Sequence, residues 1–360
     1  MRHNGGRMKE SPLHPLHRRL GAQMAETGGW NMPQQFRDLI DEHLATRSAC
    51  AIFDISNLGK FRLQGHGALD WLEQHLTNTI ADCCDGHTLQ SLILRDNGII
   101  LDRMTVLRES AGRFFLLGSA SLADADFSHL NRNLRSSNLV LTNETDRLCG
   151  IAITGPDSQR VLRDVLHDVE LPPPGSFCTI RRSGQRCTLS HCGLMAAGGF
   201  EFFCPAAAGI AWFEGLLAAG AIPCGHKTGE YLRISRGISD MDNDNHGLSP
   251  AAASLSHLCS TGKPYTGSRA LQEAPPPRSR LIALRCSTPG HPLSPGDRVQ
   301  NLDGGHVGCL TSATQAADNG HSYALAYVSA THTEPGTHLQ IIADGHPIPA
   351  MVEAKDKVLC

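Results

Sequence analysis

The sequence lacks any run of about 20 consecutive apolar residues, the length that a helix needs to cross a bilayer. No membrane-spanning segment is therefore predicted among its 360 residues. The sequence also lacks a strong charge of one sign, because Lys and Arg number 32 and Asp and Glu 35, for a net charge of -3. Without a basic surface, composition gives no reason to predict nucleic-acid binding.

The cysteines lack the spacing of a disulfide or zinc framework. There are 13 of them, an odd number, with no C-x-x-C and only Cys83–Cys84 adjacent. This usage predicts thiols in a reducing compartment that serve as small apolar side chains. The histidines are equally scattered, so no metal site is predicted. Because no apolar core follows the basic start, a secretory signal is not expected either, and we predict a cytoplasmic protein.

Three common nucleotide-binding and hydrolase motifs are also missing. The sequence has no G-x-G-x-x-G after a strand, no G-x-x-x-x-G-K-[ST] and no G-x-S-x-G. A dinucleotide-binding fold, a P-loop enzyme and an α/β-hydrolase are therefore disfavoured. The chemistry must come from a less conspicuous pattern.

The pattern of strands and helices predicts an α+β fold. The chain opens with a basic stretch, so residues 1–12 are predicted to be a disordered tail; translation from Met8, or docking to an acidic partner, are alternatives. Phe36, Ile40 and Leu44 recur every four residues and predict a helix over 33–48. Strands and helices then follow in two similar passes. The first pass has strands within 50–65, a helix at 68–76, a hairpin over 89–107, a strand at 113–118 and a helix at 122–134. The second has a strand at 150–155, a helix at 157–166 capped by Asp157, strands within 178–189 and 200–204, and a helix at 207–218.

A proline-rich stretch divides the chain. The sequence APPPR at 274–278 cannot continue a helix or a central strand, so it is predicted to be a linker. Beyond it, short apolar runs alternate with Gly, Asp and Pro turns over 279–360, which predicts a small β-barrel or jelly-roll domain. We expect α+β domains over 13–149 and 150–273 before it.

Seven stretches, in order, resemble one family, the glycine cleavage T-proteins, which are aminomethyltransferases. The quoted stretches are GGWNMPQQF leading to AIFDISNLGKFRLQG (28–65), GIILDRMTV (98–106), GIAITGP (150–156), GGFEFFCP (198–205), YLRISRGISDMDND (231–244), GKPYTGSRAL (262–271) and GGHVGCLTSA (304–313). The resemblance runs from about residue 13 to the C-terminus. It implies a three-domain cloverleaf around a folate pocket, with tetrahydrofolate as the one-carbon acceptor. It also implies a lipoylated carrier protein as partner, or a small-molecule one-carbon donor.

Asp102 is the candidate catalytic residue. Aspartate is rare in strands, yet Asp102 interrupts the apolar strand that follows the Asn97–Gly98 turn. The resemblance aligns it with the family's aspartate that faces the reactive nitrogens of folate. A carboxylate there can steer a proton and stabilise positive charge, and partial burial would raise its pKa. The alternatives are an edge-strand carboxylate in water, or a partner for Arg103.

Four further residues are candidate folate contacts. Glu201 matches the family's pterin-binding glutamate, and a carboxylate can accept two parallel N–H donors; the alternative is a solvent-facing Glu between phenylalanines. Arg233 matches an arginine beside the folate site, where it could pair with folate carboxylates or hold an acidic neighbour by a forked bond. Trp30 and Tyr265 match family aromatics and could equally be core residues.

Several family positions are changed. Arg103 replaces a second aspartate, Ser119 an asparagine and Gln90 a tyrosine, and Cys192–Ala196 reads CGLMA where the family has T-G-Y-T-G. These changes leave open a folate-dependent demethylase acting on a small methylated compound. A non-enzymatic folate-binding accessory protein for iron–sulfur assembly is a further alternative, disfavoured because Pro264 stands where that branch has a cysteine. A binding subunit without catalysis is the last alternative.

Overall fold

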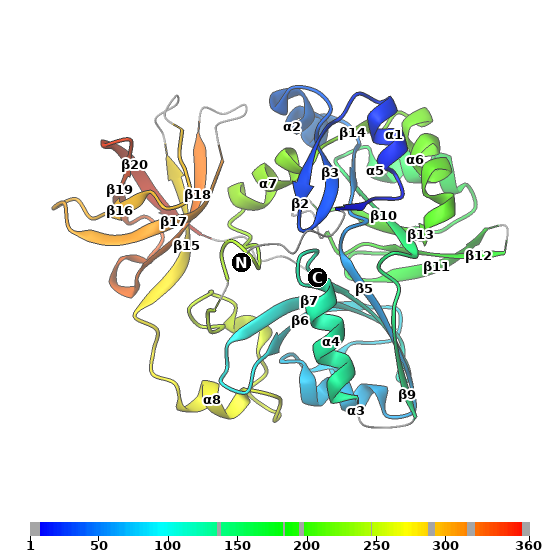
Figure 1. The fold of residues 1–360 in the computed structure, drawn as a ribbon, viewed down its shortest axis with the longest axis horizontal. Helices are drawn as coiled ribbons and strands as arrows, with labels where there is room; N and C mark the ends of the chain where they lie inside the picture. Colours follow the sequence, from blue (N-terminus) through cyan, green and yellow to red (C-terminus); the bar gives the residue numbers. More distant parts are fainter. Residues whose placement is uncertain are drawn as a thin grey trace.

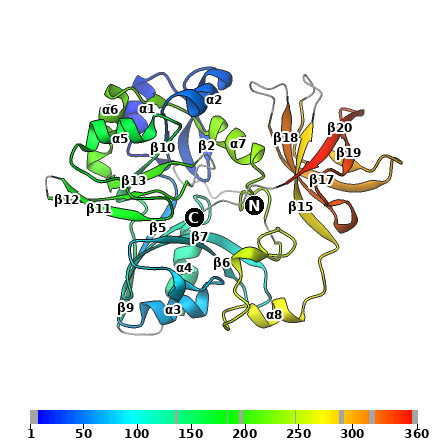
Figure 2. The same ribbon diagram turned by 180° about the vertical axis from the view of Figure 1, so that it is seen from behind.

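The computed structural model describes residues 8–134, 138–182, 184–193, 198–245, 247–286, 292–314 and 321–354. Three lobes surround a common centre (Figures 1 and 2). The predicted disordered tail is wrong for its last residues, because Lys9–Glu10 form strand β1, which pairs in parallel with Trp30 and Asn31. Residues 1–7 of that prediction lie outside the described ranges.

The first lobe is built on a six-stranded sheet in the order β11-β12-β13-β10-β4-β14. Helices α5 and α6 cover one face, where Leu162 and Phe213 join a core with Ile151 and Phe202. A small sheet, β1-β3-β2, lies beside it. The bounds are β1 Lys9–Glu10, α1 His14–Arg19, β2 Gln23–Thr27, β3 Trp30–Gln35, α2 Leu39–Ser48, β4 Ala51–Asp54, β10 Leu148–Thr154, α5 Ser158–Leu166, β11 Phe177–Arg182, β12 Gln185–Ser190, β13 Phe200–Pro205, α6 Gly209–Ala218, β14 Ile222–Pro223 and α7 His226–Ser235.

The second lobe is a five-stranded sheet in the order β6-β7-β8-β5-β9, with helices packed on one face. The predicted hairpin at Asn97–Gly98 is confirmed, since β6 and β7 pair antiparallel and Gly98 takes a φ of 79°, which glycine adopts without a steric penalty. The bounds are β5 Gly59–Gly65, α3 Ala68–His75, β6 Thr88–Leu94, β7 Ile100–Ser110, β8 Arg113–Gly118, α4 Ala123–Asn133, β9 Leu139–Asn143 and α8 Ser268–Glu273. Helix α8 comes later in the chain but lies beside the second lobe (Figure 1). Its Leu271 packs against the β6–β7 hairpin.

The third lobe is a closed barrel in the order β15-β18-β17-β16-β19-β20, which confirms the predicted C-terminal β-barrel. It follows residues 274–278, which form no helix or strand. Helix α7 packs on it through Ile234, which meets Leu281 and Leu325. The bounds are β15 Ser279–Cys286, β16 Arg298–Gln300, β17 His306–Thr314, β18 Ser322–Ser329, β19 His338–Ala343 and β20 His346–Glu353.

The predicted boundary between residues 149 and 150 is wrong. Strand β4 pairs with β10, Phe53 opposite Ala152, so residues 51–54 belong to the sheet that holds β13. The second lobe is an insertion between β4 and β10, running from β5 to β9. Long-range pairing places the boundary there, and no local composition marks it.

The predicted helix over 33–48 is wrong at its start. Met32 and Pro33 lie in strand β3, and the helix begins at Leu39 after Asp38, whose carboxylate accepts the Ile40 N–H. Ile40 and Leu44, expected to be buried, are 45% and 43% exposed. The helix instead buries polar residues. Asp157 precedes α5 as predicted but makes no side-chain cap bond there.

No helix within the described ranges is long and apolar enough to cross a membrane.

Candidate functional site

A cleft of about 480 Å³ lies where the first two lobes and α7 meet. Strand β3, the β4–β5 connection, the ends of β7 and β8, α7 and the segment 238–243 all line it. These elements come from widely separated parts of the chain, so the cleft exists only in the folded molecule. Figure 1 shows them converging on the centre of the three lobes.

The cleft is lined by both apolar and polar side chains. Apolar surface comes from Met32, Phe53, Ile55 and Leu58. Acidic side chains also line the cleft: Glu26, Asp54, Glu230, Asp240 and Asp242. Such a site suits a flat aromatic ring with hydrogen-bonding edges, because the ring faces need apolar contact and the edge N–H groups need acceptors.

Asp102 is fully buried on β7, one layer behind the cleft. Its Oδ1 accepts the Ser119 hydroxyl at 2.6 Å and its Oδ2 accepts the Ser119 N–H at 2.8 Å. Ser119 itself lines the cleft, and Asp102 does not. A Cβ on Gly118 would lie 3.0 Å from Asp102 Oδ2, so glycine makes room for the carboxylate. The alternative of an edge-strand carboxylate in water is excluded, and two hydrogen bonds from Ser119 join Asp102 to the lining of the cleft.

Asp126 on α4 is a second buried carboxyl that the sequence interpretation missed. It is 3% exposed, and Asp102 is close enough to influence its pKa. Burial raises the pKa of Asp126 to about 10, and the charge of Asp102 adds to the effect. Burial also raises the pKa of Asp102, although nearby Asp126 and the hydrogen bonds from Ser119 oppose it. A signal was available, because Ala123, Asp126 and Leu130 follow an i, i+3, i+7 pattern that places Asp126 on the buried stripe of the helix.

Arg103, next to Asp102, faces the cleft. Side chains alternate along a strand, so the residue beside a buried one points to the other face. Arg103 lines the cleft and donates to the Ser239 carbonyl at 3.3 Å. The cleft side of β7 therefore carries a cation where the resemblance leads one to expect an acid.

Arg233 on α7 lies at the wall of the cleft, but protein groups use its donors. Nε and Nη2 fork onto Glu230 at 2.6 Å each, and Nη1 donates to Asp244 at 2.9 Å. The remaining N–H groups reach the Ile238 carbonyl and Ser312. All five N–H donors are thus engaged. The geometry matches the forked-bond alternative and leaves no donor for a folate carboxylate in this arrangement.

Glu201 is 1% exposed, so the solvent-facing alternative is excluded. On β13 its Oε2 accepts the Ser190 hydroxyl at 2.8 Å and the Cys192 thiol at 3.0 Å. Glu201 does not line the cleft. The changed stretch Cys192–Ala196 continues from this contact, and its residues 194–196 lie outside the described ranges.

The structure does not bring Trp30 or Tyr265 to the cleft. Trp30 is buried on β3, with the Lys9 ammonium 5.4 Å from its ring centre. Tyr265 packs near Leu92 and Ile100 at the far side of the second lobe, next to Lys263. Both positions are those of packing residues.

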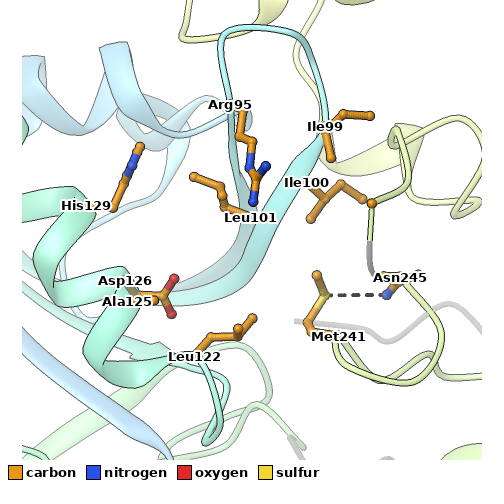
Figure 3. A pocket seen from close by; sticks show the side chains of 11 residues that line it. Arg95, Ile99, Ile100, Leu101, Leu122, Ala125, Asp126, His129, Met241 and Asn245 are labelled. Atoms are coloured by element: carbon orange, nitrogen blue, oxygen red, sulfur yellow. Dashed lines mark hydrogen bonds between the residues drawn. The ribbon is translucent and has the colours of Figure 1, made fainter. Parts of the chain in front are cut away.

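A second cavity, of about 170 Å³, lies beside the start of β7 and the first turns of α4. Arg95, Asp126 and His129 supply its polar lining, and Ile100 and Leu101 line it from β7 (Figure 3). Met241 lines both this cavity and the cleft. Within the described residues, no group of three or more His, Cys, Asp or Glu could hold a metal ion.

Taken together, the inserted second lobe, the closed barrel and the central cleft define a three-domain α+β protein whose first two lobes share a cleft. Comparison with known proteins identifies the family to which it belongs. Residues 13–263 match the family described as the GCVT N-terminal domain, and residues 279–356 match the glycine cleavage T-protein C-terminal barrel domain. The chain therefore belongs to the glycine cleavage T-protein family.

Relatives of known name agree over nearly the full length. A protein of Deinococcus deserti named aminomethyltransferase is 31% identical over 355 residues, 95% of each chain. One of Phocaeicola vulgatus with the same name is 32% identical, covering 96% of this chain and 98% of its own. The crystal structure of glycine cleavage system aminomethyltransferase T from Bartonella henselae superposes with a TM-score of 0.88 at 24% identity, over 97% of both chains. The family is one of enzymes, and the fold confirms the predicted cloverleaf.

Proposed function

We propose that this protein is a tetrahydrofolate-dependent one-carbon transferase of the aminomethyltransferase type. It would move a methylene or methyl group from an amine-type donor to folate. The observation that carries the proposal is the central cleft, with the carboxylate of Asp102 held behind Ser119 at its wall. Bound tetrahydrofolate would supply the nitrogen that accepts the one-carbon group.

The residues of the cleft fit a reduced folate. Met32, Phe53 and Leu58 offer apolar surface to the ring faces. Positive charge that develops in the cleft during transfer would be stabilised by the Asp102 carboxylate behind Ser119, whose field is weakly screened because the group is buried. Glu201 stays a proposal as the pterin acceptor. It lies outside the cleft lining, so this role is tested directly by the effect of Glu201→Gln on folate binding.

The partner of the proposed reaction is inferred from the family alone, and its location from the lack of a signal segment. A lipoylated carrier protein would be the partner if the donor is glycine-derived, and the cytoplasm is the expected location. A folate-dependent demethylase is the second candidate, favoured by Arg103. A cation at the cleft wall attracts a donor that carries a carboxylate, such as an N-methylated amino acid.

Calorimetric titration with tetrahydrofolate tests the proposal. We expect binding by the wild type, at least tenfold weaker binding by Glu201→Gln, equivalent to about 1.4 kcal/mol, and nearly unchanged binding by Asp102→Asn. Glu214→Gln, on the exposed face of α6, is the matched control. Failure of the wild type to bind would refute the folate assignment. If it binds, a donor screen that follows folate products separates transferase from demethylase.

A further inference from the structure

The second cavity is bounded by an acid and a cation that do not pair with each other. Figure 3 shows the guanidinium of Arg95, from the β6–β7 hairpin, and the carboxyl of Asp126, from α4, both pointing into it. Asp126 Oδ2 is buried and has no hydrogen-bond partner among the described residues. The Arg95 side chain makes no hydrogen bond or ion pair with any of those residues either. The two groups therefore leave room for a molecule that contacts both.

Asn245 supplies a second unpaired acceptor at the cavity wall. It is fully buried, and its Nδ2 donates to Ser239 Oγ at 2.8 Å and to Met241 Sδ at 3.4 Å (Figure 3). These two bonds orient the amide and leave Oδ1 without a donor within the described ranges. A buried acceptor without a donor is unfavourable, and a bound molecule is one way to compensate it. The unpaired oxygen adds to the preference of the cavity for a positively charged donor.

The volume and the apolar lining limit the size of the molecule. Ile100, Leu101 and Leu122 line the cavity with carbon atoms. Its volume of about 170 Å³ is close to that of a cavity that holds benzene, with about six non-hydrogen atoms. The Arg95 side chain is exposed, so the cavity meets solvent at the hairpin. A nucleotide or a folate is too large for this space, whereas a small metabolite can enter it.

A small amino acid matches this set of groups. Its ammonium can donate to Asp126, because a carboxyl oxygen accepts hydrogen bonds whether or not the group holds a proton. Its carboxylate can take the forked donors of Arg95, and its carbon atoms can contact the apolar lining. A simple anion would satisfy Arg95 alone, and a simple amine would satisfy Asp126 alone. Only a molecule with both charges satisfies both groups.

We propose that the second cavity is a binding site for a small amino acid, held by Asp126 at its ammonium group and by Arg95 at its carboxylate. The site is separate from the cleft, because Arg103 and Ser119 line the cleft and not this cavity. Met241 lines both, so the two sites are neighbours. The inference goes beyond the proposed function and does not depend on folate binding in the cleft.

Calorimetric titration of the full-length protein without folate tests the site. The probes are L-alanine and β-alanine, which have the same size but hold their two charges at different separations. We expect at least one of them to bind, and propionate and ethylamine, which carry one charge each, to bind at least tenfold more weakly. Binding of neither amino acid would overturn the proposal and leave the cavity to solvent. Equal binding of a fragment with one charge would also overturn it.

Variants place the bound amino acid. Arg95→Gln and Asp126→Ala should each weaken its binding at least tenfold. Asp124→Asn, at an exposed position of α4, and Arg103→Gln, in the cleft, are the matched controls and should bind it as the wild type does. Loss of binding in Arg103→Gln with retention in Arg95→Gln would place the amino acid in the cleft and overturn the proposal.

Two further measurements keep the test decisive. Thermal unfolding without ligand shows whether each variant is folded, and if Asp126→Ala is not, the exposed Arg95→Gln still decides. Tetrahydrofolate is titrated separately. If the wild type binds an amino acid but no tetrahydrofolate, the proposed function fails and the amino-acid site stands.

Discussion

The Glu42 carboxylate on α2 accepts the Thr228 hydroxyl of α7 at 2.6 Å. The same fully buried carboxylate accepts the N–H groups of Phe36, Arg37 and Gly225. One side chain thus joins α2 to the end of β3 and to α7, two elements that line the cleft.

Glu42→Ala should therefore destabilise the fold strongly. Removing the carboxylate leaves the buried donors of Gly225 and Thr228 and the part-buried N–H groups of Phe36 and Arg37 without this acceptor. We expect the free energy of unfolding to fall by about 3 kcal/mol or more. Urea unfolding measures it. Asp41→Ala, at an exposed position of the same helix, should change stability by less than about 0.5 kcal/mol. Equal effects of the two changes would contradict the structural role given to Glu42.

Arg233→Lys should weaken the docking of the barrel on α7. Asp244, which Arg233 holds at 2.9 Å, also accepts the hydroxyls of Thr311 and Ser312 from β17. A lysine keeps the charge but cannot reproduce the fork. We expect a loss of about 2 to 4 kcal/mol in unfolding free energy and faster proteolysis within 274–278. Unchanged stability with lost tetrahydrofolate affinity would instead indicate a direct ligand contact.

Glu109 should make stability depend on acid pH. Burial raises its pKa, but hydrogen bonds and charge from Arg186 and Arg62 outweigh this and hold the pKa below its usual value. The contribution is present above the unfolded pKa of about 4.3 and is lost as pH falls through the lower folded pKa. Glu109→Gln should therefore cost about 1 to 3 kcal/mol at pH 7 and much less near pH 3.

A surface ion pair gives the control for Glu109. Glu214 pairs with Arg19 at 2.6 Å, but both side chains are at least half exposed, so Glu214→Gln should cost less than about 1 kcal/mol. Thermal unfolding at several pH values compares the two. A cost for Glu109→Gln that stays constant down to pH 3 would refute the assignment.

Asp126 should have the opposite pH signature. Its folded pKa, about 10, lies above the unfolded value of 3.8. Its stabilising contribution is full below the unfolded pKa and is lost as pH rises toward the folded one. Unfolding free energy of the wild type should fall between pH 5 and pH 9, and that of Asp126→Asn should fall less. Parallel curves for the two proteins would contradict the raised pKa, and Asp124→Asn should follow the wild type.

Local signals predicted the second lobe and the barrel well. The Asn97–Gly98 turn and the alternating strands around it depend on neighbouring residues, so the sequence shows them directly. The helix around Ile40 was misplaced because Glu42, His43, Ala45 and Thr46 are its buried residues. Hydrophobic periodicity cannot detect a helix face that is buried through hydrogen bonds.

The site was predicted in part. The buried carboxyl at Asp102 stood out because an aspartate interrupted a strand. Its connection to the cleft, through Ser119, and its neighbour Asp126 depend on tertiary packing between β7, β8 and α4. The role of Arg233 at the folate site stays a prediction, and only the structure reveals that Glu230 and Asp244 occupy its guanidinium group.

The crossing from β4 in one sheet to β5 in the next, over residues 55–58, has an evolutionary consequence. The chain leaves the first sheet at Asp54 and returns to it at Leu148. Genetic exchange that breaks the chain between these points divides one sheet between two parents, so these two lobes must be inherited together. The barrel is entered through the single extended segment 274–278, and recombination there exchanges it whole, provided that the incoming barrel offers hydroxyls to Asp244.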